Sequence, residues 1–496
     1  MMITEYAGYV LIFVYMTTAF LLMIYGLNCY VMIYLFTKNG KKAAEKRQNV
    51  RRVFDDDHAA SDLPRVTTQI PIFNEYNVAE RIIRSVCAMT YPLGRHDIQV
   101  LDDSTDETRD LVDQLVREYS DKGHDIVCLR RKERVGYKAG ALAEGFTRAK
   151  GDFVAIFDAD FVPPHDFLIK SMPFFLVQEN LGLVQARWGH LNTNHSMLTR
   201  AQSIGIDGHF MVEQGARNGA GLYMNFNGTA GIFRKQAISD AGGWQWDTLT
   251  EDMDLSYRVQ FAGWETLYLP DLVVPAEIPE DIRAFKSQQF RWAKGSMETA
   301  LKLFPTIFGS RVSVFKKMEA FFHLTHYMVH PLMLLLSILA LPVMTVMNTG
   351  PGPVMFGFLA ILLFFSMSAP SALYLVSQRS GYKNWLSRII YLPFLIITGT
   401  GIALSNSRAV FEALIGHKSA FIRTPKKGDK QKKKYRTMVP VSALFELGLG
   451  LYCAFSFCMY MAHGKYLVGP FLGIYATGYL YTGILTLLHS LAANES

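Results

Sequence analysis

The sequence predicts an α/β domain that is inserted between transmembrane helices. Long apolar runs lie near the N-terminus and in the last third of the chain, and a more polar region, residues 38–312, separates them. In that region short apolar runs alternate with amphipathic stretches, a pattern typical of strands and helices that form a parallel sheet. Apolar residues make up 50% of the chain and charged residues only 19%, which agrees with a protein partly embedded in lipid.

The first apolar run predicts a transmembrane helix within residues 1–37. Residues 7–36 are almost wholly apolar and exceed the roughly 20 residues that cross a bilayer. Basic residues follow this run, whereas they precede the apolar part of a cleaved signal peptide. They are Lys38, Lys41, Lys42, Lys46, Arg47, Arg51 and Arg52. Because cytosolic flanks are enriched in Lys and Arg, we predict an outside N-terminus and a cytosolic domain over residues 38–312.

Within the cytosolic region, the apolar runs and the amphipathic stretches can be assigned in order. Buried strands are predicted at VTTQIPIF, DIQVLDD, DIVCLRR, DFVAIFDAD and LGLVQARWG. Helices are predicted at VAERIIRSVCAM, DETRDLVDQLVREYS and KAGALAEGFTRAK. Ligands bind beyond the carboxyl ends of parallel strands. The polar residues that follow these runs are therefore the candidates for a functional site.

Residues 313–496 predict a C-terminal membrane region with about four transmembrane helices. The predicted spans are 328–347, 354–376, 440–461 and 467–489. A further stretch, 388–416, is predicted to be interfacial or re-entrant, because a crossing there would place the basic loop 417–439 outside. The basic residues of that loop are Lys426, Lys427, Lys430, Lys432, Lys433, Lys434 and Arg436. The C-terminus is then cytosolic.

Charge, cysteine content and missing motifs argue against several other classes. The formal net charge is +7, from 50 Lys and Arg against 43 Asp and Glu, and the excess lies beside the apolar segments. This position favours contact with membrane lipids and argues against nucleic-acid binding. The five cysteines contain no CxxC pair, so neither a zinc site nor a disulfide framework is predicted. The patterns GxxxxGK[ST], GxGxxG and HExxH are absent from the sequence.

Two aspartates after a strand-like run are candidates for a metal site. Asp158 and Asp160 follow FVAIF, two positions apart. Both carboxylates can reach one hard cation, which prefers oxygen ligands and can bridge to phosphate oxygens. The alternative is an ordinary polar strand end.

A second pair, Asp102 and Asp103, follows the run DIQVL. Helix capping by Ser104 or Thr105 together with Glu107 explains the hydroxyl residues after it. Capping does not require two adjacent carboxylates, so the pair is a candidate for holding the base or ribose of a nucleotide.

A third acidic cluster contains Glu251, Asp252 and Asp254. Carboxylates this close repel one another, which raises the pKa of at least one of them. A raised pKa suits a base that removes a proton from a sugar hydroxyl. The alternative is an acidic helix N-terminus, which the helix dipole favours.

Cationic and aromatic side chains complete the candidate site. Arg291 and Trp292 follow Gln288 in the stretch QQFRW, and Lys138 lies in GYKAG. Arginine can form two parallel hydrogen bonds to a diphosphate, lysine can contact phosphate, and an indole ring offers a face for a sugar ring. The alternatives are an amphipathic helix with a buried tryptophan and a solvated lysine.

In this order the motifs resemble those of the inverting family-2 glycosyltransferases of the cellulose synthase superfamily. The stretches PIFNE, QVLDDSTD, GYKAGAL, VAIFDADF, FNGTAG, TEDMDL and QQFRW are most similar to the plant cellulose synthase-like A proteins, the (gluco)mannan synthases, and their microbial relatives. The resemblance covers residues 60–310 strongly, whereas the flanking spans agree only in layout. It implies a GT-A (Rossmann-like) glycosyltransferase fold for the cytosolic domain.

The resemblance also implies roles for individual residues. Asp252 would be the catalytic base, and Asp158 and Asp160 would hold Mg²⁺ or Mn²⁺. The residues implied to bind the donor are Asp102, Asp103, Lys138, Gln288 and Arg291. The residues implied to bind the acceptor are Phe226, Asn227, Gly228, Thr229, Glu251 and Trp292. Residues 421–426, FIRTPK, resemble the gating-loop pattern FxVTxK of cellulose synthases, but Arg423 replaces its valine and Pro425 looks inserted.

The implied reaction is processive transfer of a hexose from UDP-glucose or GDP-mannose to a growing β-linked polysaccharide, a β-glucan or (gluco)mannan, with translocation of the product as an option. The alternative is transfer of one sugar to a membrane lipid such as ceramide or diacylglycerol. The expected partners are the nucleotide sugar, the glycan or lipid acceptor and membrane lipids, with no nucleic acid. The expected location is the plasma membrane or the Golgi. A pure channel would not need ordered carboxylate motifs, and a hydrolase would need two carboxylates that flank a bond.

Overall fold

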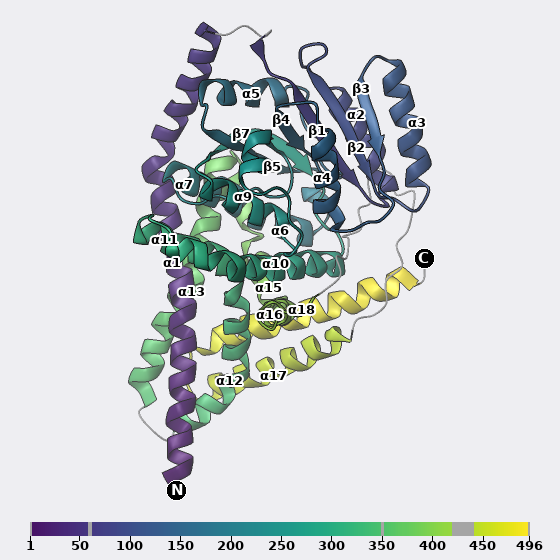
Figure 1. Cartoon of the computed structure of the whole chain (residues 1–496). Helices are drawn as coiled ribbons and strands as arrows, with labels where there is room; N and C mark the ends of the chain where they lie inside the picture. Colours follow the sequence, from purple (N-terminus) through teal and green to yellow (C-terminus); the bar gives the residue numbers. More distant parts are fainter. Residues whose placement is uncertain (1, 58–61, 349–351, 419–440, 495–496) are drawn as a thin grey trace.

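The computed structural model describes residues 2–57, 62–348, 352–418 and 441–494. An α/β domain lies at one end of the molecule, and long helices form the other end (Figure 1). The segment that resembles a gating loop, residues 421–426, lies outside the described residues, as does most of the basic loop 417–439.

A seven-stranded sheet forms the centre of the α/β domain, in the order β3-β2-β1-β4-β6-β5-β7. Its strands are β1 (Val66–Ile72), β2 (His96–Asp102), β3 (Asp125–Leu129), β4 (Phe153–Ile156), β5 (Leu181–His190), β6 (Gly231–Arg234) and β7 (Glu265–Ala276). The α/β fold class is confirmed, but the sheet is mixed, because β6 runs antiparallel to both β4 and β5. After β5 the chain leaves the sheet and re-enters it at the same end of the strands. β6 therefore runs in the direction opposite to β5.

Two apolar cores cover the two faces of this sheet. Along β4, Phe153 and Ala155 belong to one core, and Val154 and Ile156 belong to the other, because successive strand residues point to opposite faces. The first core includes α2 (Tyr76–Cys87), α3 (Thr108–Asp121) and α5 (Phe167–Val177). The second includes α4 (Tyr137–Arg148), α8 (Lys235–Asp240) and α9 (Glu251–Phe261).

One uninterrupted helix, α1 (Met2–Asp57), runs from the N-terminus along the length of the molecule (Figure 1). The transmembrane helix predicted within residues 1–37 therefore continues through the basic residues that follow it. It packs against α12 (Val329–Asn348) and α13 (Gly352–Gly381), and also against α5 and α7 (Gln214–Gly219) of the α/β domain. The approach to α13 is close, since a Cβ on Gly26 would lie 2.8 Å from the Cα of Ser366.

Five helices among the described residues are long and apolar enough to cross a membrane. They are Tyr6–Asp56, Val314–Met347, Val354–Gly381, Ser442–Ala462 and Gly469–Leu491; the last two correspond to α17 (Ser442–Ala462) and α18 (Gly469–Asn494). The stretch predicted to be interfacial or re-entrant forms α14 (Trp385–Ile389), α15 (Leu392–Gly401) and α16 (Ala403–Leu414). It bends by 45° before α16, as a broken span or a re-entrant loop would.

Helix α10 (Ile282–Gly309) joins the α/β domain to the membrane helices. Two buried ion pairs connect α10 to the membrane helices. Lys286 pairs with Glu446 of α17, and Lys294 Nζ lies 3.1 Å from Glu412 Oε2 of α16. Because α10 also carries the QQFRW stretch, these pairs position that stretch relative to the membrane helices.

Candidate active site

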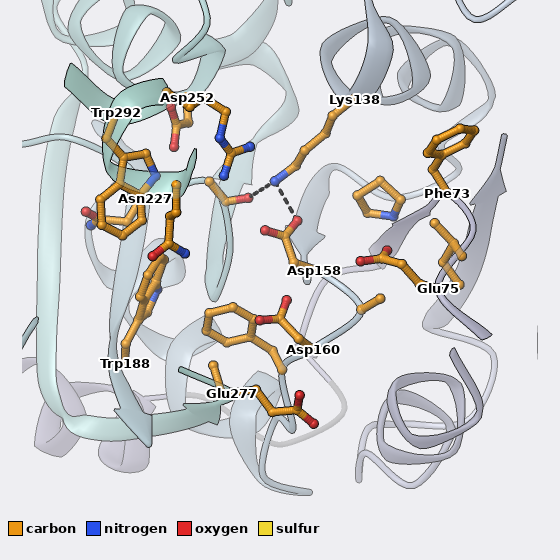
Figure 2. Close-up of a pocket in the computed structure, with 18 of the residues that line it drawn as sticks. Phe73, Glu75, Lys138, Asp158, Asp160, Trp188, Asn227, Asp252, Glu277 and Trp292 are labelled. Carbon is orange, nitrogen blue, oxygen red and sulfur yellow. Dashed lines mark hydrogen bonds and ion pairs between the residues drawn. The ribbon is translucent and has the colours of Figure 1, made fainter. Parts of the chain in front are cut away.

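The carboxyl ends of the strands open into a cavity beside α10 (Figure 2). Its walls come from the ends of β1, β2, β4 and β5, from the first turns of α4 and α9, and from α10. This is where ligands bind in sheets of this type. The residues predicted from the sequence that line the cavity are Asp103, Lys138, Asp158, Asp160, Asn227, Gly228, Glu251, Asp252, Gln288, Arg291 and Trp292.

Asp158 and Asp160 lie where the chain leaves β4. Asp158 Oδ1 is 2.5 Å from Lys138 Nζ, and the Asp158 backbone N–H donates to Thr229 Oγ1 at 2.9 Å. Asp160 is buried and also faces the cavity. The two carboxylates supply oxygen ligands of the kind that Mg²⁺ and Mn²⁺ prefer.

Asp252 lies in the first turn of α9, with its carboxylate against Gly228. A Cβ built on Gly228 would lie 2.8 Å from Asp252 Oδ2 and 3.4 Å from Lys138 Nζ, and the Gly228 φ of 80° favours glycine as well. Burial, and next the charge of Glu251, raise the pKa of Asp252 to about 7, although Lys138 and Arg291 oppose this. A carboxylate with this pKa is suited to accept a proton near neutral pH.

The third member of the acidic cluster has a structural role. Asp254 is fully buried and lies 2.7 Å from Arg258 and 3.0 Å from Lys302. It does not line the cavity. The cluster thus divides into two cavity residues, Glu251 and Asp252, and one paired residue.

The two aspartates at the end of β2, Asp102 and Asp103, also differ. Asp103 lines the cavity, and Arg131 donates to both of its oxygens, at 3.1 and 2.5 Å. Asp102 is 1% exposed and does not line the cavity. Its carboxylate accepts from Arg130 Nε at 2.8 Å and from the Ser104 backbone N–H at 3.0 Å. The structure therefore brings Asp103 to the cavity and gives Asp102 contacts that stabilise the loop behind it.

The loop before β6 has two residues in the cavity and two behind it. Asn227 and Gly228 line the cavity. Phe226 is buried in the second core, with its ring centroid 4.9 Å from that of Phe233. Thr229 is fully buried. The buried residues fix the position of the two exposed to the cavity.

Several cavity residues were not predicted. Trp188 and His190 lie at the end of β5, and the Trp188 ring stacks on Phe210 with centroids 4.9 Å apart. The strand-end rule would have identified both residues if it had been applied to LGLVQARWG. Arg134 also lines the cavity, with its guanidinium 3.4 Å from the centre of the Phe73 ring, and no sequence motif indicated it.

The cavity combines a carboxylate of raised pKa, Asp252, with the cations Arg134, Lys138 and Arg291 and the carboxylates of Asp158 and Asp160. Burial lowers the pKa of Lys138, but Asp158 and Glu251 outweigh this effect and raise it, so Lys138 is charged. Together with Arg291, it suits a diphosphate. Such a site can deprotonate a hydroxyl while it stabilises an anionic leaving group.

The first comparison with known proteins defines the class. Residues 64–295 match the family described as Glycosyltransferase like family 2. The "Mannosyltransferase PcManGT from Pyrobaculum calidifontis in complex with GDP-Man and Mn2+" has the same fold, at a TM-score of 0.50 and 19% identity, over 79% of this chain and 99% of that chain. The α/β domain therefore has the GT-A-like fold of a family-2 glycosyltransferase.

Plant relatives then define the family. Glucomannan 4-beta-mannosyltransferase 9 of Arabidopsis thaliana is 32% identical over 96% of this chain and 92% of that protein. Glucomannan 4-beta-mannosyltransferase 7 of the same plant is 33% identical over 91% of this chain and 83% of that protein. Glucomannan 4-beta-mannosyltransferase 2 is 44% identical over a shorter part, 53% of this chain and 50% of that protein. The chain belongs to the glucomannan 4-beta-mannosyltransferase family, the cellulose synthase-like A proteins, which confirms the resemblance.

Proposed function

We propose that this protein elongates a β-linked glycan by repeated transfer of a hexose, foremost mannose, from a nucleotide sugar. The observation that carries the proposal is Asp252, a half-buried carboxylate with a pKa of about 7 that lies in one cavity with Lys138 and the Asp158–Asp160 pair. The names of the full-length relatives support a mannan or glucomannan product. They do not favour the alternative of a ceramide or diacylglycerol acceptor.

The donor half of the cavity is proposed to bind GDP-mannose, with UDP-glucose as the other candidate. PcManGT, which shares the fold, is in complex with GDP-Man. Lys138 and Arg291 would bind the diphosphate, together with Gln288, which lies with Arg291 on α10. Asp103 would contact the nucleoside. Asp102 is proposed to act on the nucleoside only through the loop, because Arg130 and Ser104 already occupy its oxygens.

Asp158 and Asp160 are proposed to hold Mg²⁺ or Mn²⁺. The donor set fits such an ion, since both ligands are carboxylates and both face the cavity. The described part of the chain has no group of three or more His, Cys, Asp or Glu side chains that could hold a metal, so the diphosphate and water would complete the coordination. When bound, the ion supplies positive charge against the leaving diphosphate.

The proposed mechanism is a single displacement at the anomeric carbon. Asp252 takes the proton from the acceptor hydroxyl, and its raised pKa favours that transfer. Lys138 and Arg291 stabilise the departing nucleoside diphosphate. One attack inverts configuration, so an α-linked donor gives a β-linkage.

The acceptor half is proposed to include Asn227, Gly228, Glu251 and Trp292. All four line the cavity. Trp292 lies on α10, which the two buried ion pairs join to the membrane helices. A glycan end held there would lie beside the helices through which a translocated product would pass. Phe226 and Thr229 are proposed to support this loop from the core.

The catalytic domain is proposed to face the cytosol, in the plasma membrane or the Golgi. The candidate spans make the chain a multi-pass membrane protein. Seven basic residues follow the apolar part of α1, within residues 38–52, and such residues favour the cytosolic side. On the cytosolic side, the catalytic domain would have access to nucleotide sugars made in the cytosol.

The test is incorporation of radiolabelled sugar by the purified, detergent-solubilised protein. GDP-mannose and UDP-glucose are supplied in parallel with Mg²⁺ or Mn²⁺, and the products are sized and digested with β-mannanase and β-glucanase. The expected result is label of high molecular weight that β-mannanase releases. Label confined to the organic-soluble lipid fraction would overturn the proposal in favour of a lipid acceptor.

A further inference from the structure

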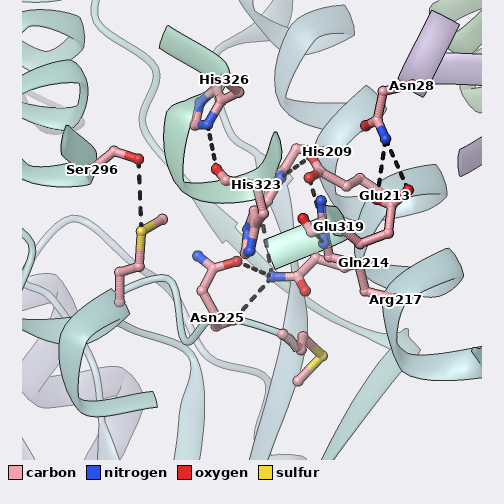
Figure 3. A network of polar contacts seen from close by, with 12 residues as sticks. Asn28, His209, Glu213, Gln214, Arg217, Asn225, Ser296, Glu319, His323 and His326 are labelled. Carbon is pink, nitrogen blue, oxygen red and sulfur yellow. Dashed lines mark hydrogen bonds and ion pairs between the residues drawn. The ribbon is translucent and has the colours of Figure 1, made fainter. Parts of the chain in front are cut away.

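His209 belongs to a network of polar side chains (Figure 3). It also contacts Asn227, which lines the cavity. It lies in η3 (Gly208–Glu213), a π-helical turn between α6 (Met197–Asp207) and α7. Turns of this kind inside helices are rare and occur often at functional sites. Both ring nitrogens have partners, since Nδ1 lies 2.9 Å from Glu213 Oε2 and Nε2 lies 2.9 Å from Asn227 Oδ1.

The side-chain amide of Asn227 has a defined orientation. Asn225 Nδ2 donates to Asn227 Oδ1 at 3.0 Å, so the atom that faces His209 is the amide oxygen. The backbone N–H of Asn227 donates to Gln185 Oε1 at 2.9 Å. Because an amide oxygen only accepts, the contact is a hydrogen bond from His209 Nε2–H to Asn227 Oδ1; Gln214 Nε2 lies farther from the same nitrogen, at 3.4 Å.

The second ring nitrogen of His209, Nδ1, faces charged groups. Arg217 Nε lies 3.0 Å from Glu213 Oε1. Burial raises the pKa of Glu213, but Arg217 and His209 outweigh this and hold it well below its usual value, so an ionised carboxylate faces Nδ1 of His209. The other groups that face this cluster, from α11 (Val314–Thr325) and η4 (His326–Met328), are Glu319, His323 and His326.

The loop has little room to absorb a shift of Asn227. The next residue, Gly228, accepts a hydrogen bond from Lys138 at 2.7 Å through its carbonyl oxygen. Its Cα lies against Asp252, where even a methyl group would collide. A displacement of Asn227 would therefore reach the proposed base and the proposed diphosphate ligand through one peptide unit.

The same network ends at the first membrane helix. Arg217, which holds Glu213, donates to the backbone carbonyl of Glu319 at 3.4 Å. The Glu319 carboxylate accepts from Asn28 Nδ2 of α1 at 3.0 and 3.1 Å. His209 thus contacts the cavity loop at Asn227, and the network extends to Asn28 of α1.

We propose that His209 is a positioning residue, which donates to Asn227 and holds the loop in the conformation that receives the acceptor sugar. The inference rests on the proposed function, in which Asn227 and Gly228 bind the acceptor. His209 itself does not line the cavity, so its effect reaches the acceptor through Asn227.

Two substitutions of His209 test the contacts of its two ring nitrogens one at a time. In His209→Gln the amide can replace the Nε2 donor to Asn227, whereas in His209→Asn it can replace only the Nδ1 donor to Glu213. With a β-linked manno-oligosaccharide as acceptor, His209→Asn is expected to raise the acceptor KM about tenfold, the factor for one lost hydrogen bond, with the donor KM unchanged. His209→Gln is expected to stay near the wild-type KM. Equal effects of the two variants would overturn the proposal.

A second measurement does not depend on activity. Amide hydrogen exchange of the segment 223–231 is compared in the wild type and both variants, after thermal unfolding has shown equal stability. Faster exchange is expected in His209→Asn and not in His209→Gln, and no change in either would overturn the proposal. His124→Asn, in the turn before β3, is the matched control. If the wild type transfers no sugar to the oligosaccharide, the proposed function fails while the exchange data still test His209.

A double-substitution cycle covers the case in which one variant is unstable. If His209 acts through Asn227, His209→Leu is expected to have no further effect on the acceptor KM in an Asn227→Ala background. Additive effects of the two substitutions would contradict the proposal.

Discussion

In the proposed donor half of the cavity, the carboxylates follow the strands that position them, whereas the proposed acceptor half is assembled from distant parts of the chain. Asp103 follows β2, and Asp158 and Asp160 follow β4. In the acceptor half, Asn227 precedes β6 and Trp292 lies on α10. The carboxylates of the donor half thus depend on the sheet, whereas Gln288 and Arg291 share α10 with Trp292. The Asn227 loop also contacts the network that reaches α1, so changes in that network are expected to affect the acceptor more than the donor.

The largest effect is expected where the two halves meet. Asp252→Asn removes the proposed base and should lower kcat about 10³-fold, while the Kd for the nucleotide sugar, measured by calorimetry, should change little. If the variant retained a tenth of the wild-type rate, Asp252 would not be the base. Glu265→Gln, at the exposed start of β7, is a matched control that should leave kcat unchanged.

The next effect tests the attachment of α10 to the membrane helices. Lys286→Met leaves Glu446 buried without its ion-pair partner and should reduce the free energy of unfolding by about 3–5 kcal/mol. The double variant Lys286→Met, Glu446→Leu should recover most of that loss, because an apolar pair needs no compensation for desolvation. Thermal unfolding in detergent measures both. A double variant as unstable as the single one would show that the ion pair is not the reason.

A smaller effect separates loop geometry from backbone strain. Gly228→Ala should lower kcat about 10²-fold, since the methyl group collides with Asp252 and displaces the loop. Gly243→Ala is the control, because Gly243 also has a positive φ, 72°, but open space around its Cα. It should reduce stability with little effect on kcat. Similar kcat values for the two variants would contradict the role of Gly228 in the cavity.

The smallest effect concerns pH. A carboxylate base works when deprotonated, so kcat/KM should fall as the pH drops below about 7, the pKa of Asp252. Glu251→Gln removes the neighbouring negative charge that raises this pKa, so the midpoint of the pH profile should move to lower pH. Glu144→Gln, on the exposed surface of α4, should leave the midpoint unchanged. An unchanged midpoint in Glu251→Gln would show that another group controls the profile.

The same comparison explains how much the sequence could predict. Strands β1 to β5, the α/β class and the strand-end carboxylates follow from local patterns, whereas β6 and β7 were not predicted. The order of motifs led to the family. The direction of β6 and the different roles of Asp102 and Asp103 depend on contacts with residues far along the chain, such as Arg130 and Arg131. His209 could not be found locally either, since its partner Asn227 belongs to another segment.

The continuity of α1 limits how its length can vary. A helix turns by about 100° and rises about 1.5 Å for each residue. Gly26 contacts α13, and Phe36 contacts Gly215 of α7. The number of residues between these two contacts therefore sets the angle between the two contact faces of α1. Insertion of one residue would rotate one contact away from its partner, and insertion of seven would restore the phase but shift the domain by about 10 Å. This segment of α1 is therefore a fixed-length spacer, which should tolerate substitutions far better than insertions or deletions.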